Sequence, residues 1–210
     1  MEFPRLSERR TPTRYTFLIT TLIFAVVVAM PLGAADKKAT TSGIYLTADD
    51  FLSGKLTSEG ERDSSSHNIK LHDSFFGKPY IDVVHNGENR RYPKSEVWGY
   101  RDVDGKSYRF VDNDAYEIRE AGKLFIYSVN RLVLGRKGAS EPVYYFSVGP
   151  AASVVPLTVI NLKTVFPENH RFHDYLDMAF RSDWDLTRFD KFHNMYRVNH
   201  FLISSESSDR

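Results

Sequence analysis

Two histidines near the C-terminus have a spacing that could hold a metal ion. His170 and His173 lie three residues apart, and Asp174 and Asp177 extend the same face if the segment is helical. Two imidazoles and a carboxylate leave zinc an open coordination position, as hydrolytic zinc sites require. The arrangement is not the H-E-x-x-H motif, and such residues near a helix start are ordinarily solvated. We therefore expect no metal and no cofactor, with a site at His170, His173 and Asp174 as the alternative.

Nucleophilic catalysis has no recognisable motif in this chain. No serine sits in a G-x-S-x-G turn, and neither a phosphate-binding loop nor a dinucleotide-binding fingerprint occurs. Cysteine is absent, which excludes disulfides, thiolate metal sites and a cysteine nucleophile. Asp104 and Asp112 are expected to stabilise turns, as aspartates at strand ends commonly do. The sequence favours a protein that is not an enzyme. The alternative is a hydrolase or metal-dependent enzyme that uses the histidine-bearing C-terminal helices.

Aromatic residues in the middle of the chain are the candidates for binding. They could form a flat platform for a sugar or an apolar ligand, and they are Trp98, Tyr100, Tyr108, Tyr144 and Tyr145. About half of the residues in a strand face the core, because side chains alternate, and aromatic residues are most often used for core packing. We take Trp98, Tyr100 and Tyr144 as the candidate binding residues.

Successive β-hairpins between Pro79 and Val129 must position these aromatic residues. Asn86-Gly87 predicts a type I′ turn, because both positions need positive φ. The register this implies pairs Val83 with Arg90 and Ile81 with Tyr92. Pro93 cannot donate to a ladder, so the return strand should end there.

Two further hairpins are predicted from their turn residues. A two-residue loop at Asp104-Gly105 would place Phe110 opposite Gly99, where the ring could cover the glycine, and Arg109 opposite Tyr100. A turn at Ala121-Gly122 would pair Ile118 with Phe125 and Tyr116 with Tyr127. A further strand is predicted over residues 143–148.

The spacing of apolar residues changes to a helical period after these strands. Helices are predicted over residues 158–166, after Asn169, and from Leu186 to about Phe201. A short helix capped by Thr47 is predicted earlier in the chain. Strands followed by helices indicate an α+β fold, an antiparallel β-meander followed by two or three C-terminal helices. The meander could curl or become barrel-like, since apolar groups occupy both faces of its strands.

The N-terminus has the pattern of a targeting segment. Four arginines precede an apolar run over residues 15–32, and small residues at Gly33-Ala34-Ala35 come before a polar stretch. We predict a signal peptide over residues 1–35, cleaved after Ala35, with an uncleaved membrane anchor as the alternative. A single α+β domain over residues 43–202 and a polar tail over 203–210 would follow.

Charge limits the partners of the predicted mature chain. The net charge of the whole sequence is +1, and removing residues 1–35 removes four arginines and two glutamates, which leaves −1. A domain so close to neutrality has no evident electrostatic preference for nucleic acid. We expect an exported protein of the periplasm or cell envelope that acts through binding or assembly. Its partner would be an envelope protein or a small ligand, with membrane contact through residues 15–32 if that segment is retained.

Four stretches together resemble a group of uncharacterised exported proteins of Gram-negative bacteria. The stretches are residues 43–51, Phe76-Gly77-Lys78, residues 98–102 and residues 144–147. The resemblance covers most of the predicted mature chain. It implies export and a single domain, and it implies no activity, ligand or site residue.

Overall fold

The computed structural model describes residues 41–61, 66–72, 77–133, 135 and 138–207. The chain divides into Met1–Ala35 and Asp36–Arg210, and every described residue belongs to the second unit. The predicted signal peptide or anchor lies outside the described residues. Within the described ranges, no helix is both long and apolar enough to cross a membrane.

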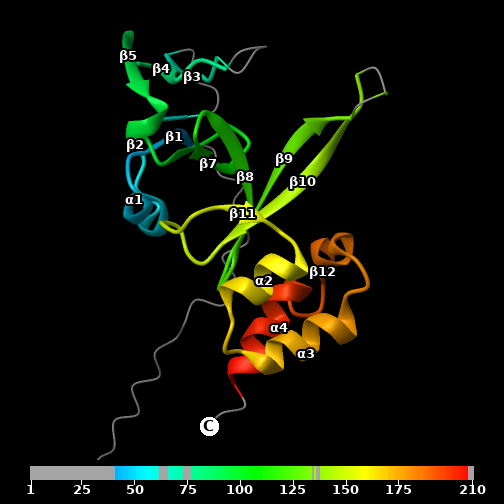
Figure 1. Cartoon of the computed structure of the whole chain (residues 1–210). Coiled ribbons are helices and arrows are strands. Elements are labelled where there is room, and N and C mark those ends of the chain that lie inside the picture. Colours follow the sequence, from blue (N-terminus) through cyan, green and yellow to red (C-terminus); the bar gives the residue numbers. More distant parts are fainter. Residues whose placement is uncertain (1–40, 62–65, 73–76, 134, 136–137, 208–210) are drawn as a thin grey trace, which may run out of the picture. The chain divides into compact units, whose positions relative to one another are not determined.

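An eight-stranded antiparallel sheet is the main element of the fold (Figure 1). Its strands run in the order β11-β10-β9-β8-β7-β6-β1-β2. Their bounds are β1 Thr41–Tyr45, β2 Thr57–Glu61, β6 Gly99–Arg101, β7 Ser107–Val111, β8 Asp114–Ala121, β9 Phe125–Leu132, β10 Ser140–Ser147 and β11 Val155–Pro156. Strands β6 to β11 are neighbours in chain order, so the predicted α+β meander is confirmed. The sheet is open, with β11 and β2 at its edges, so the barrel-like alternative is wrong.

The first predicted hairpin does not belong to this meander. Strands β4 (Tyr80–His85) and β5 (Glu88–Pro93) join β3 (His67–Lys70) in a separate three-stranded sheet of order β3-β4-β5. The hairpin itself is as predicted: Asn86 and Gly87 have φ of 52° and 81°, and Val83 pairs with Arg90 and Ile81 with Tyr92. The turn fixes the local register, whereas burial of Ile81 and Val83 against the large sheet places the hairpin.

The second hairpin is shifted by one residue from the prediction. Gly99 pairs with Arg109 and Tyr100 with Tyr108, not with Phe110 and Arg109. The Asp102 backbone N–H donates to the Lys106 carbonyl at 2.9 Å, which leaves a three-residue loop with Gly105 at a φ of 81°. Such a loop is the G1-bulge type rather than the two-residue type.

The third hairpin also has a different register. Ile118 pairs with Tyr127 and Ala121 with Phe125, with an irregularity between Ile118 and Glu120. A β-bulge adds one residue to one strand and shifts the pairing beyond it. The predicted pairs Ile118–Phe125 and Tyr116–Tyr127 are therefore wrong.

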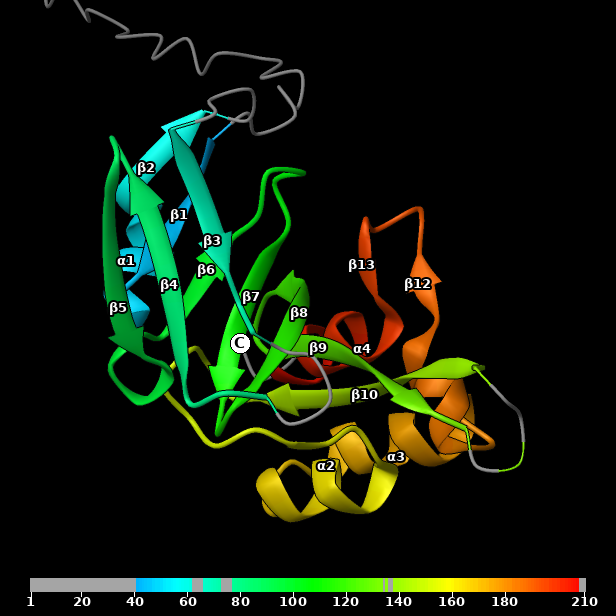
Figure 2. The ribbon, with the colours of Figure 1, turned by 90° about the horizontal axis from the view of Figure 1, so that it is seen from above.

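Two groups of elements cover different parts of one face of the large sheet. Directly paired residues Ile44, Tyr100, Tyr108, Glu117, Ser128 and Tyr144 form a row across six strands on this face. The small sheet packs at the Ile44 and Tyr100 end of the row, and the C-terminal helices pack near Tyr144, against Ile126 and Phe146. Figure 2 shows the small sheet near β1 and β6 and the helices beside β9 and β10.

The helices begin at capping side chains that the sequence makes recognisable. Helix α1 (Ala48–Ser53) starts with a reciprocal capping box between Thr47 and Asp50. Helix α2 (Val159–Val165) starts at Thr158, and α3 (His170–Ala179) starts at Asn169, whose Oδ1 accepts from the Phe172 N–H at 2.9 Å. These positions match the predictions, and α2 ends before Pro167.

The last predicted helix is wrong over most of its length. Residues 183–187 form a 3₁₀ turn, η2, and Phe189–Asp190 (β12) pairs with Met195–Tyr196 (β13) before α4 (Arg197–Glu206) begins. Asp190 Oδ1 accepts from the N–H groups of Phe192 and His193 at 2.9 and 3.2 Å. These local bonds favour a turn over a helix. Because α4 continues to Glu206, the predicted polar tail begins later than expected. A 3₁₀ turn, η1 (Lys94–Glu96), links β5 to β6.

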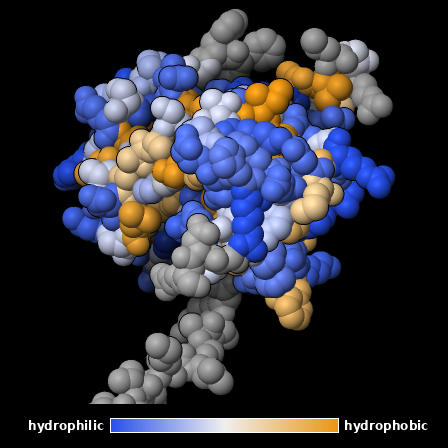
Figure 3. Space-filling model, turned by 60° about the horizontal axis from the view of Figure 1, so that its bottom comes forward, coloured by the Kyte–Doolittle hydropathy of each residue, from blue (hydrophilic) through white to orange (hydrophobic). Residues whose placement is uncertain are grey.

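Large apolar side chains that remain exposed are concentrated in the C-terminal region. They include Ile160, Met178, Trp184 and Phe192, exposed by 77, 74, 65 and 90 %. On the face drawn in Figure 3, hydrophobic residues form separate patches among hydrophilic ones. Scattered exposed apolar residues are normal for a folded chain and indicate no particular partner.

Candidate ligand-binding cavity

A cavity of about 270 Å³ lies where the small sheet meets β1 and β6 of the large one. Its polar lining comes from Ser42, His67, Asn68 and Asp102, and its apolar lining from Ile69, Leu71, Tyr100 and Val103. These residues belong to three separate segments of the chain, which the sheet order brings together. The cavity borders the core cluster that joins the two sheets.

Ser42 and His67 line this cavity and carry polar atoms that are buried without partners. Ser42 is 2 % exposed and His67 is 8 % exposed. Within the described part of the chain, Ser42 Oγ and both ring nitrogens of His67 have no hydrogen-bond partner. A buried polar group left without a partner costs about 1 to 3 kcal/mol. Two such groups beside one cavity make it the candidate site for a ligand.

Neighbouring strands fix the position of the His67 ring. His67 pairs with His85 across β3 and β4, and the two rings lie 5.6 Å apart and nearly perpendicular. On β2, a Cβ at Gly60 would come within 2.0 Å of the His67 ring, so only glycine leaves room for it. Burial lowers the pKa of His67, and the neighbouring His85 lowers that pKa further. His67 is therefore neutral near pH 7, with one nitrogen able to donate and the other to accept.

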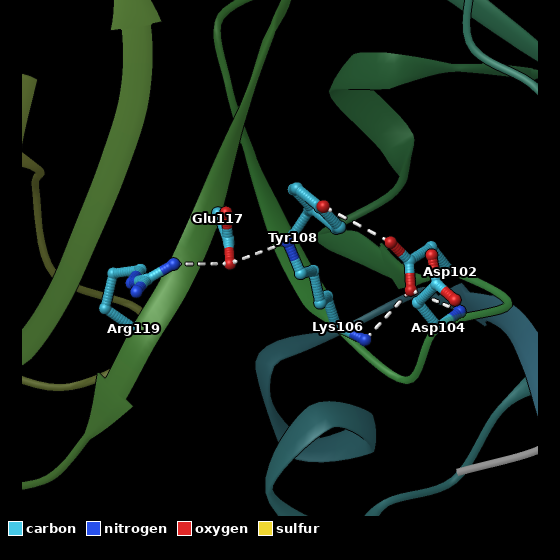
Figure 4. A network of polar contacts seen from close by, with 6 residues as sticks. All are labelled: Asp102, Asp104, Lys106, Tyr108, Glu117 and Arg119. Carbon is cyan, nitrogen blue, oxygen red and sulfur yellow. Dashed lines mark hydrogen bonds and ion pairs between the residues drawn. The ribbon is translucent and has the colours of Figure 1, made fainter. Parts of the chain in front are cut away.

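Asp102 contributes a carboxylate that the turn after β6 holds in place (Figure 4). Its Oδ1 accepts from the backbone N–H groups of Asp104 and Lys106, each at 2.9 Å. Its Oδ2 accepts from the Tyr108 hydroxyl at 3.2 Å. Burial raises the pKa of Tyr108, and the charges of Asp102 and Glu117 raise it further. Tyr108 thus stays protonated and keeps donating to Asp102.

The same network continues along the sheet away from the cavity. Lys106 Nζ lies 3.5 Å from Glu117 Oε1, and Arg119 Nη1 donates to that oxygen at 2.8 Å. In Figure 4 the Lys106 side chain reaches Glu117 on β8, and the Lys106 backbone N–H donates to Asp102. The network balances the charge of Glu117, and it holds the loop that carries Asp102 in one position.

The candidate aromatic residues do not lie on one surface. Tyr100 is 6 % exposed, and its ring stacks on Tyr108 at 4.7 Å beside the cavity. Trp98 stacks on Phe51 at 4.6 Å, and its Nε1 donates to the Pro150 carbonyl at 2.8 Å. Tyr144 packs against the C-terminal helices. Of the three candidates, the structure therefore brings only Tyr100 to the cavity.

The histidines of α3 have ordinary partners. His173 Nε2 lies 2.9 Å from the Phe166 carbonyl oxygen, and Asp177 pairs with Lys163 at 2.6 Å. His170 and Asp174 are exposed. Among the residues that the structure describes, no group of three histidine or acidic side chains is placed to hold a metal ion.

Sequence reasoning missed Ser42, His67 and Asp102 as site residues. Ser42 falls at the end of the polar stretch that follows the predicted signal peptide, and His67 directly follows the serines of a charged, polar stretch. The usable signal was alternation in β1: Ser42 shares a face with buried Ile44. A serine on the buried face of a strand needs a partner, but the sequence does not identify one.

Comparisons of the chain with protein-family models, curated protein sequences and solved structures found no match. The resemblance to exported bacterial proteins therefore stays an expectation. The function is inferred from the cavity itself.

Proposed function

We propose that this protein is an exported, non-enzymatic binding protein of the cell envelope, and that the His67 cavity holds its small ligand. The observation that carries the proposal is the pair of buried side chains Ser42 and His67, whose polar atoms lack partners among the described residues. A ligand that pairs them removes the cost of burying them unpaired. The arginine-flanked apolar run at the N-terminus supports export.

The lining indicates the chemistry of the ligand. Asp102 supplies a carboxylate, and no lysine or arginine is among the described lining residues. An anion would therefore enter without a compensating charge, which is unfavourable beside the apolar wall of Ile69, Leu71 and Val103. A neutral or cationic ligand can donate to the acceptor nitrogen of His67 and to Ser42 Oγ. Its apolar side would face Ile69, Leu71 and Val103.

The size of the cavity indicates a compact ligand. Typical ligand pockets measure about 300 to 1,000 Å³, and this cavity of about 270 Å³ is just below that range. A single sugar ring or a small amine with one apolar face matches the volume and the lining. Long polymers and large cofactors do not.

A hydrolase is the second candidate, because Ser42, His67 and Asp102 all line this cavity. A serine nucleophile needs a histidine within hydrogen-bond distance, and the histidine needs an acid to orient it. Ser42 Oγ and both His67 nitrogens are unpaired instead, and the Asp102 oxygens accept from the Asp104, Lys106 and Tyr108 groups. The observed geometry therefore favours binding over hydrolysis.

Ligand-observed NMR with a fragment library tests the proposal. The library should contain matched sets of neutral, cationic and anionic compounds with sugar-like hydroxyls or amines. The full chain should bind some neutral or cationic members. Ser42→Ala and His67→Phe should each weaken that binding about tenfold, since each removes hydrogen bonds to the ligand.

A matched control separates the cavity from the rest of the surface. His170→Phe makes the same change at an exposed histidine on α3 and should leave binding unchanged. If no fragment binds, or if both cavity variants bind as the unaltered chain does, the proposal is wrong. Covalent labelling of Ser42 by a fluorophosphonate, seen by mass spectrometry, would favour the hydrolase instead.

A further inference from the structure

Arg109 projects from the face of the large sheet opposite to the His67 cavity. It lies on β7 between Tyr108 and Phe110, which face the small sheet, so alternation turns Arg109 the other way. Its guanidinium lies 5.8 Å from the Trp98 ring centre and 5.9 Å from that of Tyr127. The side chain is half-buried among these aromatic groups.

Within the described part of the chain, Arg109 donates hydrogen bonds to neutral hydroxyl groups. Nη1 donates to Tyr127 Oη at 3.2 Å and to Ser147 Oγ at 3.5 Å. Ser147 Oγ donates its one proton to the Gly149 carbonyl at 2.7 Å. The Tyr127 hydroxyl, 2.8 Å from Ser147 Oγ, must therefore donate to Ser147 and accept from Arg109. Tyr127 and Ser147 are 0 and 1 % exposed, so this chain of donors is fixed inside the protein.

Arg109 has no counterion among the residues that the structure describes. No carboxylate of the described residues lies within ion-pair distance of its guanidinium. A guanidinium has five N–H donors in a planar fork that matches a carboxylate or phosphate group. The contacts to Tyr127 and Ser147 use only Nη1, so the fork of Nε and Nη2 is not engaged by them. A partly buried charge without a counterion is costly, and an anion would remove that cost.

A depression of about 450 Å³ has Arg109 in its lining. Arg109 and Trp98 line it, together with Thr47 at the start of α1 and with Lys94, Glu96 and Asp112. Arg109 is half-buried and Lys94 is 1 % exposed, with its Nζ donating to the Asn113 carbonyl at 2.8 Å, whereas Glu96 and Asp112 are exposed. The more buried charges of the lining are therefore positive, and its exposed charges are negative. This distribution suits a small anion and disfavours a polyanion.

We propose that this depression is a second binding site, in which Arg109 holds the carboxylate or phosphate group of a small ligand through its planar fork. The site is separate from the His67 cavity, because the two share no lining residue and prefer ligands of opposite charge. The Trp98 ring lines one side of this site. The bond from Trp98 Nε1 to the Pro150 carbonyl and the stacking on Phe51 hold its ring in place.

Thermal unfolding of the full chain in different anions tests the proposal. Acetate and inorganic phosphate are titrated at millimolar concentration against chloride at constant ionic strength. A saturable rise in Tm is expected with at least one of them, since a ligand of the folded state raises stability. A rise with acetate alone identifies a carboxylate ligand, and a rise with phosphate alone identifies a phosphate ligand. Arg109→Gln should weaken the binding at least about tenfold.

Two controls keep the outcome decisive. Arg90→Gln changes an exposed arginine on β5 and should preserve the anion effect. If Arg109→Gln does not fold, the ¹⁵Nε resonance of Arg109 in the unaltered chain should shift during the same titration. No saturable effect of either anion, or an effect that Arg109→Gln retains, overturns the proposal. An unmoved Arg109 resonance overturns it as well.

Discussion

Asn199 pairs with both backbone groups of Leu124. Asn199 Oδ1 accepts from the Leu124 N–H at 2.8 Å, and Asn199 Nδ2 donates to the Leu124 carbonyl at 2.9 Å. Both residues are fully buried. The Asn199 side chain thus replaces a neighbouring strand just before β9. It ties α4 to the meander, together with Glu120, which accepts from Asn199 Nδ2 at 2.6 Å.

Asn199→Ala should therefore destabilise the protein strongly. The change leaves the Leu124 N–H buried without a partner, while the Leu124 carbonyl keeps only the Gly122 N–H at 3.3 Å, and one such unpaired group costs about 1 to 3 kcal/mol. Urea unfolding measures the effect, with Asn130→Ala at an exposed position of β9 as the control. Similar free energies of unfolding for the two variants would contradict this function of Asn199.

Gly99 should tolerate no side chain, although not for the reason that the sequence indicated. The predicted register placed Phe110 over Gly99, but Gly99 pairs with Arg109. A Cβ at Gly99 would lie 2.0 Å from the Tyr108 carbonyl oxygen, so the backbone of β7 would have to move. We expect Gly99→Ala to cost about 2 kcal/mol or more.

Gly77→Ala is the matched control for Gly99→Ala. A Cβ there meets no atom within 4 Å, and its φ is not positive, unlike that of Gly138 at +76°. Differential scanning calorimetry should show a lower Tm for the Gly99 variant only. Equal values of Tm would mean that β6 and β7 do not approach each other as described.

Asp82 should make stability depend on pH in acid. Bonds from Arg91, at 2.8 and 3.1 Å, are the main cause that lowers the pKa of Asp82 to about 2, and His72 at 2.9 Å adds to it. The folded-state pKa lies below the ordinary value of 3.8. The contribution of Asp82 is therefore fully present above pH 4 and is lost as the pH falls toward 2.

The comparison with Asp82→Asn isolates this contribution. Free energies of unfolding in urea are measured for both proteins across the acid range. The difference between them should be constant above about pH 4 and should shrink as the pH falls toward 2. A difference in the free energy of unfolding that does not change with pH would show that these bonds do not lower the pKa of Asp82.

Export remains a prediction that the N-terminal sequence makes on its own. Arginines, an apolar run and small residues up to Ala35 predict cleavage and release outside the cytoplasm. Mass spectrometry of the protein from its native source should find a mature N-terminus at or near Asp36. An intact Met1 in a soluble cytoplasmic fraction would show that the prediction is wrong.

Local features of the fold could be predicted because single residues determine them. The Asn86-Gly87 turn fixes its own hairpin register, and Thr47, Thr158 and Asn169 mark helix starts by capping. The two-residue loop predicted at Asp104-Gly105 was wrong. The Asp102 carboxylate accepts hydrogen bonds from two later backbone N–H groups in the turn, and these bonds favour a longer loop. The helix predicted from Leu186 failed for a similar reason, since Asp190 stabilises a turn.

The cavity could not be predicted because its lining residues come from separate segments of the sequence. Ser42, His67 and Asp102 come from strands, or the turn after a strand, that the order β6-β1-β2 and the separate small sheet bring together. That order depends on burial of Ile44, Ile81 and Tyr100 in one core. Pairings between distant strands leave no pattern in a single sequence, whereas turns and caps do.

A crystal structure of the protein soaked with the best neutral or cationic fragment tests the central claim most directly. The account predicts electron density in the His67 cavity, with one ligand donor at hydrogen-bond distance from a His67 ring nitrogen and a polar atom near Ser42 Oγ. It also predicts that the apolar side of the fragment contacts Ile69 and Val103. Density for the fragment only outside this cavity, with Ser42 and His67 bonded to each other or to other protein groups, would contradict it.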